Sequence, residues 1–258
     1  MSDIPKDHPR YASLMTRERI VEGVDIGITS QQGLVAQGRG ECFDYLVGER
    51  TTTSAFFAEK VAVCMLLLAE YPILSVNGNA AALVPESLVE LSEMVGAPLE
   101  VNLFHRSDER VARIISHLKQ KGASEVLGGK GDARLSLDHG RAIVDSDGIY
   151  KADVVLVPLE DGDRCQKLVD MGKTVIAIDL NPMSRTSRTA SVTIVDNVVR
   201  ALGNMVGLAT ELKELTPFEI KNIIKEYDNE RTLSEAVREI RDGLDTIIMD
   251  SEVRHDPY

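Results

Sequence analysis

The stretch TVIAIDLNPMSRTSRTASVTIVDNVVR, residues 174–200, decides the fold expected for this chain. It begins with a short apolar run, Val175–Ile178, which is the pattern of a strand buried on both faces of a sheet. Pro182 follows shortly afterwards. It lacks an N–H group and disfavours helix at the residue before it, so the chain must leave the sheet there. We therefore expect a strand followed by a loop, in which Arg185 and Arg188 lie among hydroxyl side chains.

A second strand, Val192–Val195, follows this loop and leads into a helix that begins near Val198. Asp196 or Asn197 can cap that helix. A helix N-terminus presents free N–H groups and about half a positive charge. Together with the arginines of the loop, it suits a phosphorylated ligand. An ordinary solvent-exposed loop is equally compatible with these residues, so both interpretations stay open for this stretch alone.

Strands and helices alternate along the middle of the chain. Strands are expected at 72–76, 99–104, 125–127, 153–158, 175–178 and 192–195, and helices at 51–70, 77–95, 108–121, 160–171 and from 198 onward. This alternation predicts an α/β fold, a Rossmann-like, doubly wound and mainly parallel sheet. Further helices are expected at 11–24, from 217 onward and at 233–249. We expect one domain over residues 1–258, with a helical N-terminal segment (1–70), an α/β core (71–213) and C-terminal helices (214–258).

In such a sheet, ligands bind beyond the carboxyl ends of the strands. The loops after Val76, Phe104, Leu127, Val157 and Ile178 are therefore expected to share one edge. No GxGxxG motif opens any of these loops, which argues against a standard dinucleotide site. Asn77-Gly78-Asn79 follows a strand and opens a helix, a geometry that suits a phosphate but equally a tight turn.

Two further arginines stand out in the N-terminal segment. Arg17 is expected on the helix 11–24, where most arginines are plain surface charges. Arg39 lies in Gly38-Arg39-Gly40, at the end of a region rich in Gly, Ser and Gln that we expect to be a loop. Flanking glycines let the backbone approach a ligand, although a tight turn with an exposed arginine is a common cause of the same pattern.

Composition narrows the possible functions. The chain carries 41 acidic and 29 basic residues, a net charge of −12 that repels nucleic acid and anionic membranes. It contains no apolar run of the roughly 20 residues that a membrane span needs, and its three scattered cysteines indicate a reducing compartment, so a cytoplasmic protein is expected. No GxSxG, HExxH or CxxC motif is present, so neither an acyl-enzyme nor a protein-held metal is expected. His139, a lone histidine in a loop-rich region, is more often solvated than catalytic.

Several segments together carry a resemblance to a known family. They are HPRY (8–11), TRERIVEG (16–23), GRGE (38–41), FDYL (43–46), SVNGN (75–79), DVVLVPLEDG (153–162), DLNPMSRT (179–186) and DNVVR (196–200). With these motifs the chain resembles the archaeal phosphopantothenate synthetases, the 4-phosphopantoate–β-alanine ligases. The resemblance implies a cytoplasmic, homodimeric ligase of coenzyme A biosynthesis. Such an enzyme joins 4-phosphopantoate to β-alanine with ATP, through a phosphopantoyl adenylate, and releases AMP and diphosphate.

The resemblance also implies site residues. The positions that match the family's ATP-binding motifs are Arg17, Arg39, Asp179, Leu180, Asn181, Arg185, Thr186, Asn197 and Val198. Mg²⁺ would be held mainly by the phosphates, with at most about one carboxylate. For phosphopantoate we consider Asn77, Gly78 and Asn79, together with Asn204. The alternatives are a non-catalytic nucleotide-sensing protein on the same fold and a phosphatase- or kinase-like enzyme.

Overall fold

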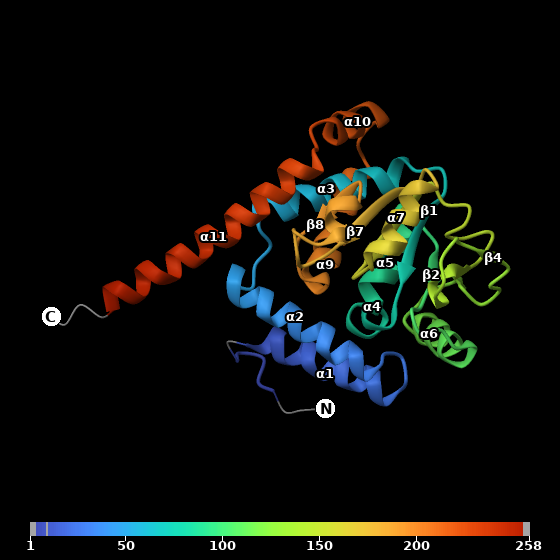
Figure 1. Cartoon of the computed structure of the whole chain (residues 1–258), viewed down its shortest axis with the longest axis horizontal. Coiled ribbons are helices and arrows are strands. Elements are labelled where there is room, and N and C mark those ends of the chain that lie inside the picture. The colour runs from blue at the N-terminus through green and yellow to red at the C-terminus, as the bar shows by residue number, and fades with distance from the viewer. Residues whose placement is uncertain (1–3, 9, 255–258) are drawn as a thin grey trace.

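A parallel sheet forms the centre of the structure, a computed structural model that describes residues 4–8 and 10–254 (Figure 1). Residues 1–3, 9 and 255–258 of the expected terminal segments lie outside the described residues. The sheet contains β1 (Pro72–Val76), β2 (Leu99–Val101), β3 (Val126–Leu127), β6 (Val154–Pro158), β7 (Thr174–Ile178) and β8 (Val192–Ile194). Its strand order is β3-β2-β1-β6-β7-β8, and every neighbouring pair is parallel. The expected Rossmann-like sheet is therefore confirmed, and its order reverses between β1 and β6, the topological switch point.

Side chains of the central strands alternate between two hydrophobic cores, as the period of a strand requires. Leu74, Leu156 and Ile176 lie in one core with α3 (Thr53–Leu68), α5 (Pro85–Val95), α6 (Asp108–Gln120) and α9 (Val198–Leu212). Ile73, Val155 and Val175 lie in the other core, against α7 (Gly162–Asp170) and a small antiparallel pair, β4 (Ala133–Arg134) and β5 (Ile143–Val144). Because both faces are covered, the sheet leaves its carboxyl edge for ligands.

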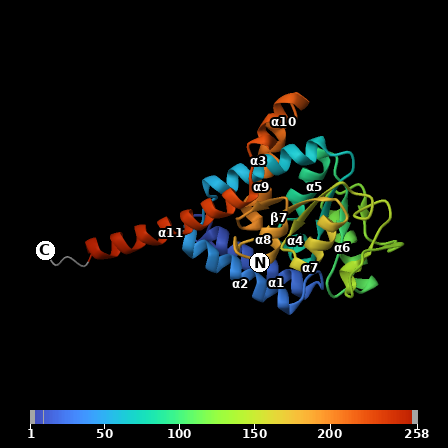
Figure 2. The same ribbon diagram turned by 45° about the horizontal axis from the view of Figure 1, so that its top comes forward.

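Two N-terminal helices, α1 (Tyr11–Asp25) and α2 (Gln31–Val47), lie side by side across that edge (Figures 1 and 2). They rest on α4 (Gly78–Leu83), the short helix after β1. A Cβ added to Gly23 would lie 2.6 Å from the Cβ of Ala82, and one added to Gly33 would overlap the side chains of Asn79 and Thr29. These glycines therefore set how closely the two helices approach α4.

Three sequence-based expectations were wrong in local detail. The region 27–40 was expected to be a loop, but most of it belongs to α2, so Gly38-Arg39-Gly40 lies inside a helix. The helix expected over 77–95 is divided into α4 and α5, because Pro85 starts a new helix at its first position. The loop 184–189 contains a short helix, α8 (Arg185–Thr189), which Ser184 caps.

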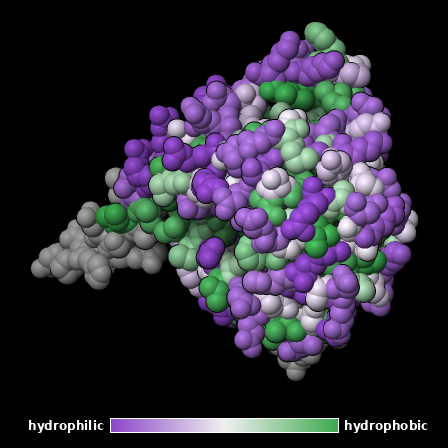
Figure 3. All heavy atoms as spheres, turned by 45° about the vertical axis from the view of Figure 1, so that its right-hand side comes forward, coloured by the Kyte–Doolittle hydropathy of each residue, from purple (hydrophilic) through white to green (hydrophobic). Residues whose placement is uncertain are grey.

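The C-terminal helices are α10 (Pro217–Lys225) and α11 (Asn229–Arg254). As expected, α10 starts at Pro217, and the Thr216 cap forms a full capping box with Glu219. The first part of α11 packs against α2, α3 and α8, and its remainder projects from the body (Figures 1 and 2). Hydrophilic side chains cover most of the face in Figure 3, in keeping with the acidic composition. Among the described residues, no helix combines the length and apolarity that crossing a membrane requires.

Candidate functional site

The larger cavity at the carboxyl edge has a volume of about 920 Å³ and lies beside the ends of β6 and β7. It is lined by the loops after these strands, by one face of α2 and by the start of α11. The structure brings six of the nine proposed ATP-binding residues together around it: Arg39, Asp179, Leu180, Asn181, Arg185 and Thr186. The loops supply most of its polar side chains, whereas Phe43 and Leu46 of α2 and Val237 and Ile240 of α11 add apolar ones. This combination suits a ligand with a charged end and an apolar ring system.

The loop after β7 holds its own shape through short-range hydrogen bonds. The Asn181 backbone N–H donates to Asp179 Oδ1 over 3.0 Å, and Ser184 Oγ donates to Asp179 Oδ2 over 2.5 Å. Ser187 Oγ donates to the Asn181 carbonyl over 2.8 Å. Asp179 is thus fixed at the end of the strand before any ligand arrives, as a preorganised binding group should be.

Arg185 and Thr186 begin α8 but have opposite surroundings. The Arg185 side chain is 62% exposed and pairs with Asp163, which is itself exposed. The Thr186 side chain is buried and donates from Oγ1 to the Glu160 carbonyl over 3.0 Å, which ties α8 to the loop after β6. The exposure of Arg185 gives no sign of a structural role for this side chain, whereas Thr186 joins the loops that follow β6 and β7.

A smaller cavity, of about 260 Å³, lies on the other side of the switch point, beside the ends of β1 and β2. Asn77, Gly78 and Asn79 line it. The Asn77 side chain caps α4 through Oδ1 and donates from Nδ2 to the Pro158 carbonyl over 2.6 Å, so it bridges the ends of β1 and β6. The Asn79 amide donates to the Gly33 carbonyl over 3.0 Å and so supports α2.

The two cavities meet at Leu159 and Ala36, which line both. Leu159 is the residue after β6 and has a φ of 55°, a left-handed conformation that is uncommon for a leucine. Backbone strain of this kind gathers at ligand sites. A ligand in one cavity would therefore face a ligand in the other across a single strained residue.

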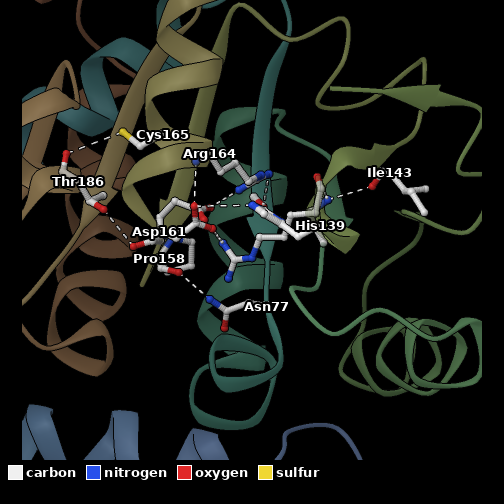
Figure 4. A network of polar contacts seen from close by, with 12 residues as sticks. Asn77, His139, Ile143, Pro158, Asp161, Arg164, Cys165 and Thr186 are labelled. Atoms are coloured by element: carbon white, nitrogen blue, oxygen red, sulfur yellow. Dashed lines mark hydrogen bonds and ion pairs between the residues drawn. The ribbon is translucent and has the colours of Figure 1, made fainter. Parts of the chain in front are cut away.

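A buried charge network lies directly behind this junction (Figure 4). Glu160 pairs through one carboxylate oxygen with Arg141 and through the other with Arg164. Arg164 also donates to Ser75 Oγ on β1 over 3.2 Å, so the network joins the two halves of the sheet. Burial, together with the neighbouring Arg164 cation, lowers the pKa of Arg141 to about 9. Both nitrogens of His139, which stacks on Phe104, are buried without a hydrogen-bond partner.

Of the remaining ATP-motif positions, only Asn197 lines a third cavity, of about 100 Å³, which lies on the opposite face of α2. Asn197 lines it, caps α9 as expected, and donates from Nδ2 to Asp44 Oδ2 over 3.2 Å. Arg17 pairs with Glu41 on α2, and this hydrogen bond is the main cause that lowers the pKa of Glu41 to about 2. Val198 is the first residue of α9, and its side chain lies in the core. Thus α2 separates Arg17 and Asn197 from Arg39.

Asn204 lies elsewhere, between α9 and α3. Its Nδ2 donates to Thr51 Oγ1 over 2.9 Å and to Glu59 Oε2 over 3.0 Å. Glu59 is fully buried, and this burial raises its pKa to about 8 although the hydrogen bond from Asn204 opposes the shift. The structure does not bring Asn204 to the same cavity as Asn77.

Sequence reasoning missed the residues that complete the smaller cavity, namely His105, Arg110 and Arg141. Arg110 lies on α6 and Arg141 in the short turn Gly140–Ala142. Neither belongs to a recognisable motif. The one available signal was topological, because His105 and Arg110 follow β2, whose end was expected at the ligand edge.

The fold and these cavities define a Rossmann-like α/β protein with two adjoining cavities at its switch point, where ligands of such sheets bind. The sequence profile of the phosphopantothenate/pantothenate synthetase family matches residues 54–243. The 4-phosphopantoate–β-alanine ligase of Methanosarcina mazei is 62% identical over 96% of this chain and 98% of its own length. The enzymes of that name from Thermococcus kodakarensis (53% identical, over 95% and 94%) and Methanospirillum hungatei (49%, over 93% and 98%) are also similar. The chain belongs to the phosphopantothenate/pantothenate synthetase family.

Proposed function

We propose that this protein is an ATP-dependent ligase that condenses 4-phosphopantoate with β-alanine. The products are 4′-phosphopantothenate, AMP and diphosphate, and the reaction passes through a phosphopantoyl adenylate. Membership of the family supports this, as do relatives that carry the name 4-phosphopantoate–β-alanine ligase over nearly the whole chain. The observation that carries the proposal is the pair of cavities that meet at Leu159, because an adenylate forms where a nucleotide and an acid touch.

ATP is proposed to occupy the larger cavity. Its apolar side chains suit the adenine ring, and Asp179, preorganised at the end of β7, suits the ribose hydroxyls. Arg39 and Arg185 are exposed and offer forked guanidinium donors to the phosphates. The lining thus offers both apolar side chains and arginines, which suit the base and the phosphates of a nucleotide respectively.

Phosphopantoate is proposed to occupy the smaller cavity, with Asn77, Gly78 and Asn79 among its contacts. Its carboxylate would then attack the α-phosphate of ATP near Leu159, and the amine of β-alanine would displace AMP from the acyl group. Both steps depend on positioning and on neutralising phosphate charge, and neither requires a nucleophile from the protein.

Arg17, Asn197 and Val198 are proposed to reach the same nucleotide after a shift of α2. Gly40 permits such a shift, because a Cβ there would lie 3.3 Å from Asn197 Nδ2 and 3.8 Å from Leu180 Cδ1. At Gly40, α2 therefore approaches the loop after β7 and the start of α9 without a side chain between them. The amide of Asn204 is already engaged by Thr51 and Glu59. Asn204 is therefore proposed to affect substrate binding only indirectly, by holding α9 in place.

Mg²⁺ is proposed to bind together with ATP. The carboxylates near the larger cavity are consistent with a cation held mainly by phosphate oxygens. The described residues contain no group of three or more His, Cys, Asp or Glu side chains that could hold a metal ion. Glu160 and Asp179 are the carboxylates that line the larger cavity among the described residues. A cation bound mainly by phosphate oxygens, with one carboxylate added, matches the usual behaviour of Mg²⁺, which neutralises phosphate charge.

We further propose a cytoplasmic homodimer without a nucleic-acid partner. The net charge of −12 opposes nucleic-acid binding. Beyond the part that lines the larger cavity, helix α11 carries exposed Leu244, which offers apolar surface to a second copy. Sedimentation analysis of the purified protein tests the dimer, and a monomer at micromolar concentration would contradict it.

The reaction itself is tested by measuring AMP release from ATP, with and without each of the other two substrates. The proposal expects full AMP release only when both 4-phosphopantoate and β-alanine are present. A nucleotide sensor would release no AMP, and a phosphatase or kinase would release ADP or phosphate without needing β-alanine. Any of those results would overturn the proposed function.

A further inference from the structure

The second step of the proposed reaction needs a proton acceptor. The nitrogen of β-alanine is an ammonium group at neutral pH, because an alkyl amine has a pKa near that of lysine, about 10. An ammonium group has no lone pair, so one proton must leave before the nitrogen attacks the acyl group of the adenylate. A second proton leaves the nitrogen as the amide forms. A side chain that takes the first proton would accelerate the step.

The carboxylates that line the larger cavity are already engaged. One oxygen of Glu160 pairs with Arg141 and the other with Arg164. Both oxygens of Asp179 accept hydrogen bonds within the loop after β7. These carboxylates are therefore committed to holding the site together, and the proton acceptor has to be sought beside them.

His139 has both ring nitrogens uncommitted. Within the described part of the chain, Nδ1 and Nε2 are buried without a hydrogen-bond partner. The ring is held by its face instead, because it stacks on Phe104 with the centroids 4.8 Å apart and the planes at 28°. The His139 carbonyl accepts a hydrogen bond from the Ala142 N–H over 2.9 Å, which fixes the backbone. A neutral imidazole keeps one nitrogen lone pair, so His139 can accept a proton without giving up a structural contact.

Asp161 faces this ring from the loop after β6 (Figure 4). Its Oδ1 lies 4.0 Å from His139 Nε2 and also caps α7, by accepting from the Arg164 N–H over 2.8 Å. Its Oδ2 lies 3.7 Å from Arg141 Nη1 and, among the described residues, is buried without a hydrogen-bond partner. A carboxylate beside an imidazole holds the ring in place and stabilises the imidazolium that forms when the ring takes a proton.

His139 and Asp161 lie beside the junction of the two cavities. Asp161 is two residues after Leu159, which lines both cavities. Phe104, on which the His139 ring stacks, lines the smaller cavity, and so does Arg141. The side chains of His139 and Asp161 are 23% and 31% exposed, so neither is sealed in the core. An amine that approaches an acyl group at the junction thus arrives next to this pair, and contacts of this kind often tighten only when substrate is bound.

We propose that His139 accepts the proton that the amine of β-alanine loses before it attacks the adenylate, and that Asp161 positions the ring and stabilises the imidazolium. This rests on the proposed function, which supplies the adenylate and the amine. The nitrogen lone pair forms the C–N bond, the bond from the acyl carbon to the phosphate oxygen breaks, and AMP leaves with that electron pair. His139 holds one of the two protons that the nitrogen loses and later passes it to solvent, which also takes the other.

The test measures the two half-reactions separately in the wild type and in His139→Gln. Diphosphate release from ATP and 4-phosphopantoate should keep the wild-type rate, because no ammonium group takes part. Acyl transfer from the preformed adenylate to β-alanine should slow by about 100-fold, a usual loss for a general base. Hydroxylamine is largely unprotonated at neutral pH, so it should capture the adenylate equally fast in both proteins.

The matched control is His117→Gln. His117 is a half-buried histidine on α6, and it lies outside the lining that the described residues give the two cavities. All three rates should be unchanged in this variant. A His139→Gln protein that transfers the acyl group to β-alanine at the wild-type rate, or that is equally slow with hydroxylamine, would overturn the proposal. Loss of the β-alanine step in His105→Gln alone would overturn it as well, because His105 would then be the base.

Asp161→Asn is a second variant that does not depend on the folding of the first. Asparagine also caps helices, so α7 keeps its start. Arg141, Glu160 and Arg164, the other charged groups of the network, remain in place. Without the Asp161 carboxylate the imidazolium is less stable, so the acid limb of the pH profile for acyl transfer to β-alanine should move to lower pH. An unmoved limb would overturn the role of the pair. A wild type that releases no diphosphate would instead overturn the proposed function, and this inference with it.

Discussion

Arg185 is an exposed cation in the lining of the proposed nucleotide site, so its role can be tested without disturbing the fold. It is 62% exposed, its partner Asp163 is exposed as well, and it lines the larger cavity. We predict that Arg185→Ala abolishes ligation, while the melting temperature hardly moves, since exposed substitutions usually change stability by less than about 0.5 kcal/mol. Thermal unfolding and the AMP assay on the same sample decide this.

Arg188→Ala is the control, because Arg188 is exposed on the same short helix but does not line the cavity. The control should keep its activity. An Arg185→Ala protein that melts much earlier, or that still ligates at the wild-type rate, would remove Arg185 from the site.

Glu59 gives a prediction about pH. Burial raises its pKa to about 8, against about 4.3 for glutamate in an unfolded chain. The folded state therefore binds this proton more tightly. The contribution of the Glu59 proton to the free energy of unfolding is fully present below about pH 4.3. It is lost as the pH rises to about 8. Asp196 and Arg200 face the same carboxyl group, the first raising and the second lowering its pKa.

Glu59→Gln removes this titration and keeps a group that can accept the hydrogen bond from Asn204. We predict that the stability of the wild type falls relative to Glu59→Gln between pH 5 and pH 8, by an amount on the order of 1 kcal/mol or more. Denaturant unfolding of both proteins across that range measures the difference. Parallel pH profiles would show that Glu59 is not held protonated.

Residues near one another in the sequence were the part of the site that sequence reasoning located best. Asp179, Asn181 and Arg185 follow one strand, so a single correct strand placement brings them to one edge. Arg110 and Arg141 come from separate elements, and their meeting depends on tertiary packing that no local pattern encodes. The division between Arg39 and Arg17 depends on how α2 packs, which the sequence did not indicate either.

At the scale of elements, the buried strands were predicted best and α2 worst. Continuous runs of β-branched residues, such as 154–158 and 174–178, have few alternatives to a strand in a parallel sheet. The glycines of α2 lower its intrinsic helix propensity and favoured the expectation of a loop. The helix forms nonetheless because Gly33 and Gly40 allow close packing against α4 and the start of α9, and this packing outweighs propensity.

Two glycines of α2 test that explanation. A Cβ at Gly33 would overlap Asn79 and Thr29, whereas a Cβ at Gly38 would meet nothing within 4 Å. We predict that Gly33→Ala destabilises the packing of α2 and increases its hydrogen exchange. Gly38→Ala should instead stabilise the helix by about 0.5–1 kcal/mol, the usual gain from replacing an exposed helical glycine. If both substitutions have the same sign in thermal unfolding and hydrogen exchange, packing does not hold α2 in place.

At the scale of the whole molecule, the proposed function requires the N-terminal helices and the α/β core to bind one nucleotide together. Arg39 lines the larger cavity with the loop after β7, and Arg17 pairs with Glu41 on the other face of α2. Because lysine replaces a forked guanidinium poorly, we predict that Arg17→Lys and Arg39→Lys each weaken ATP binding by about tenfold or more, without changing the oligomeric state. Calorimetric titration with ATP measures both. Wild-type affinity in Arg17→Lys would confine the ATP site to the Arg39 face of α2.

In the proposed reaction, two adjoining cavities let an acid and a nucleotide react without a protein nucleophile. The most direct measurement is a single turnover with ATP and 4-phosphopantoate in the absence of β-alanine, followed by analysis of the nucleotides, of diphosphate and of the intact protein mass. We predict that diphosphate is released, that phosphopantoyl adenylate stays bound, and that the protein mass is unchanged. The appearance of ADP, or of a phosphorylated or adenylylated protein, would contradict it.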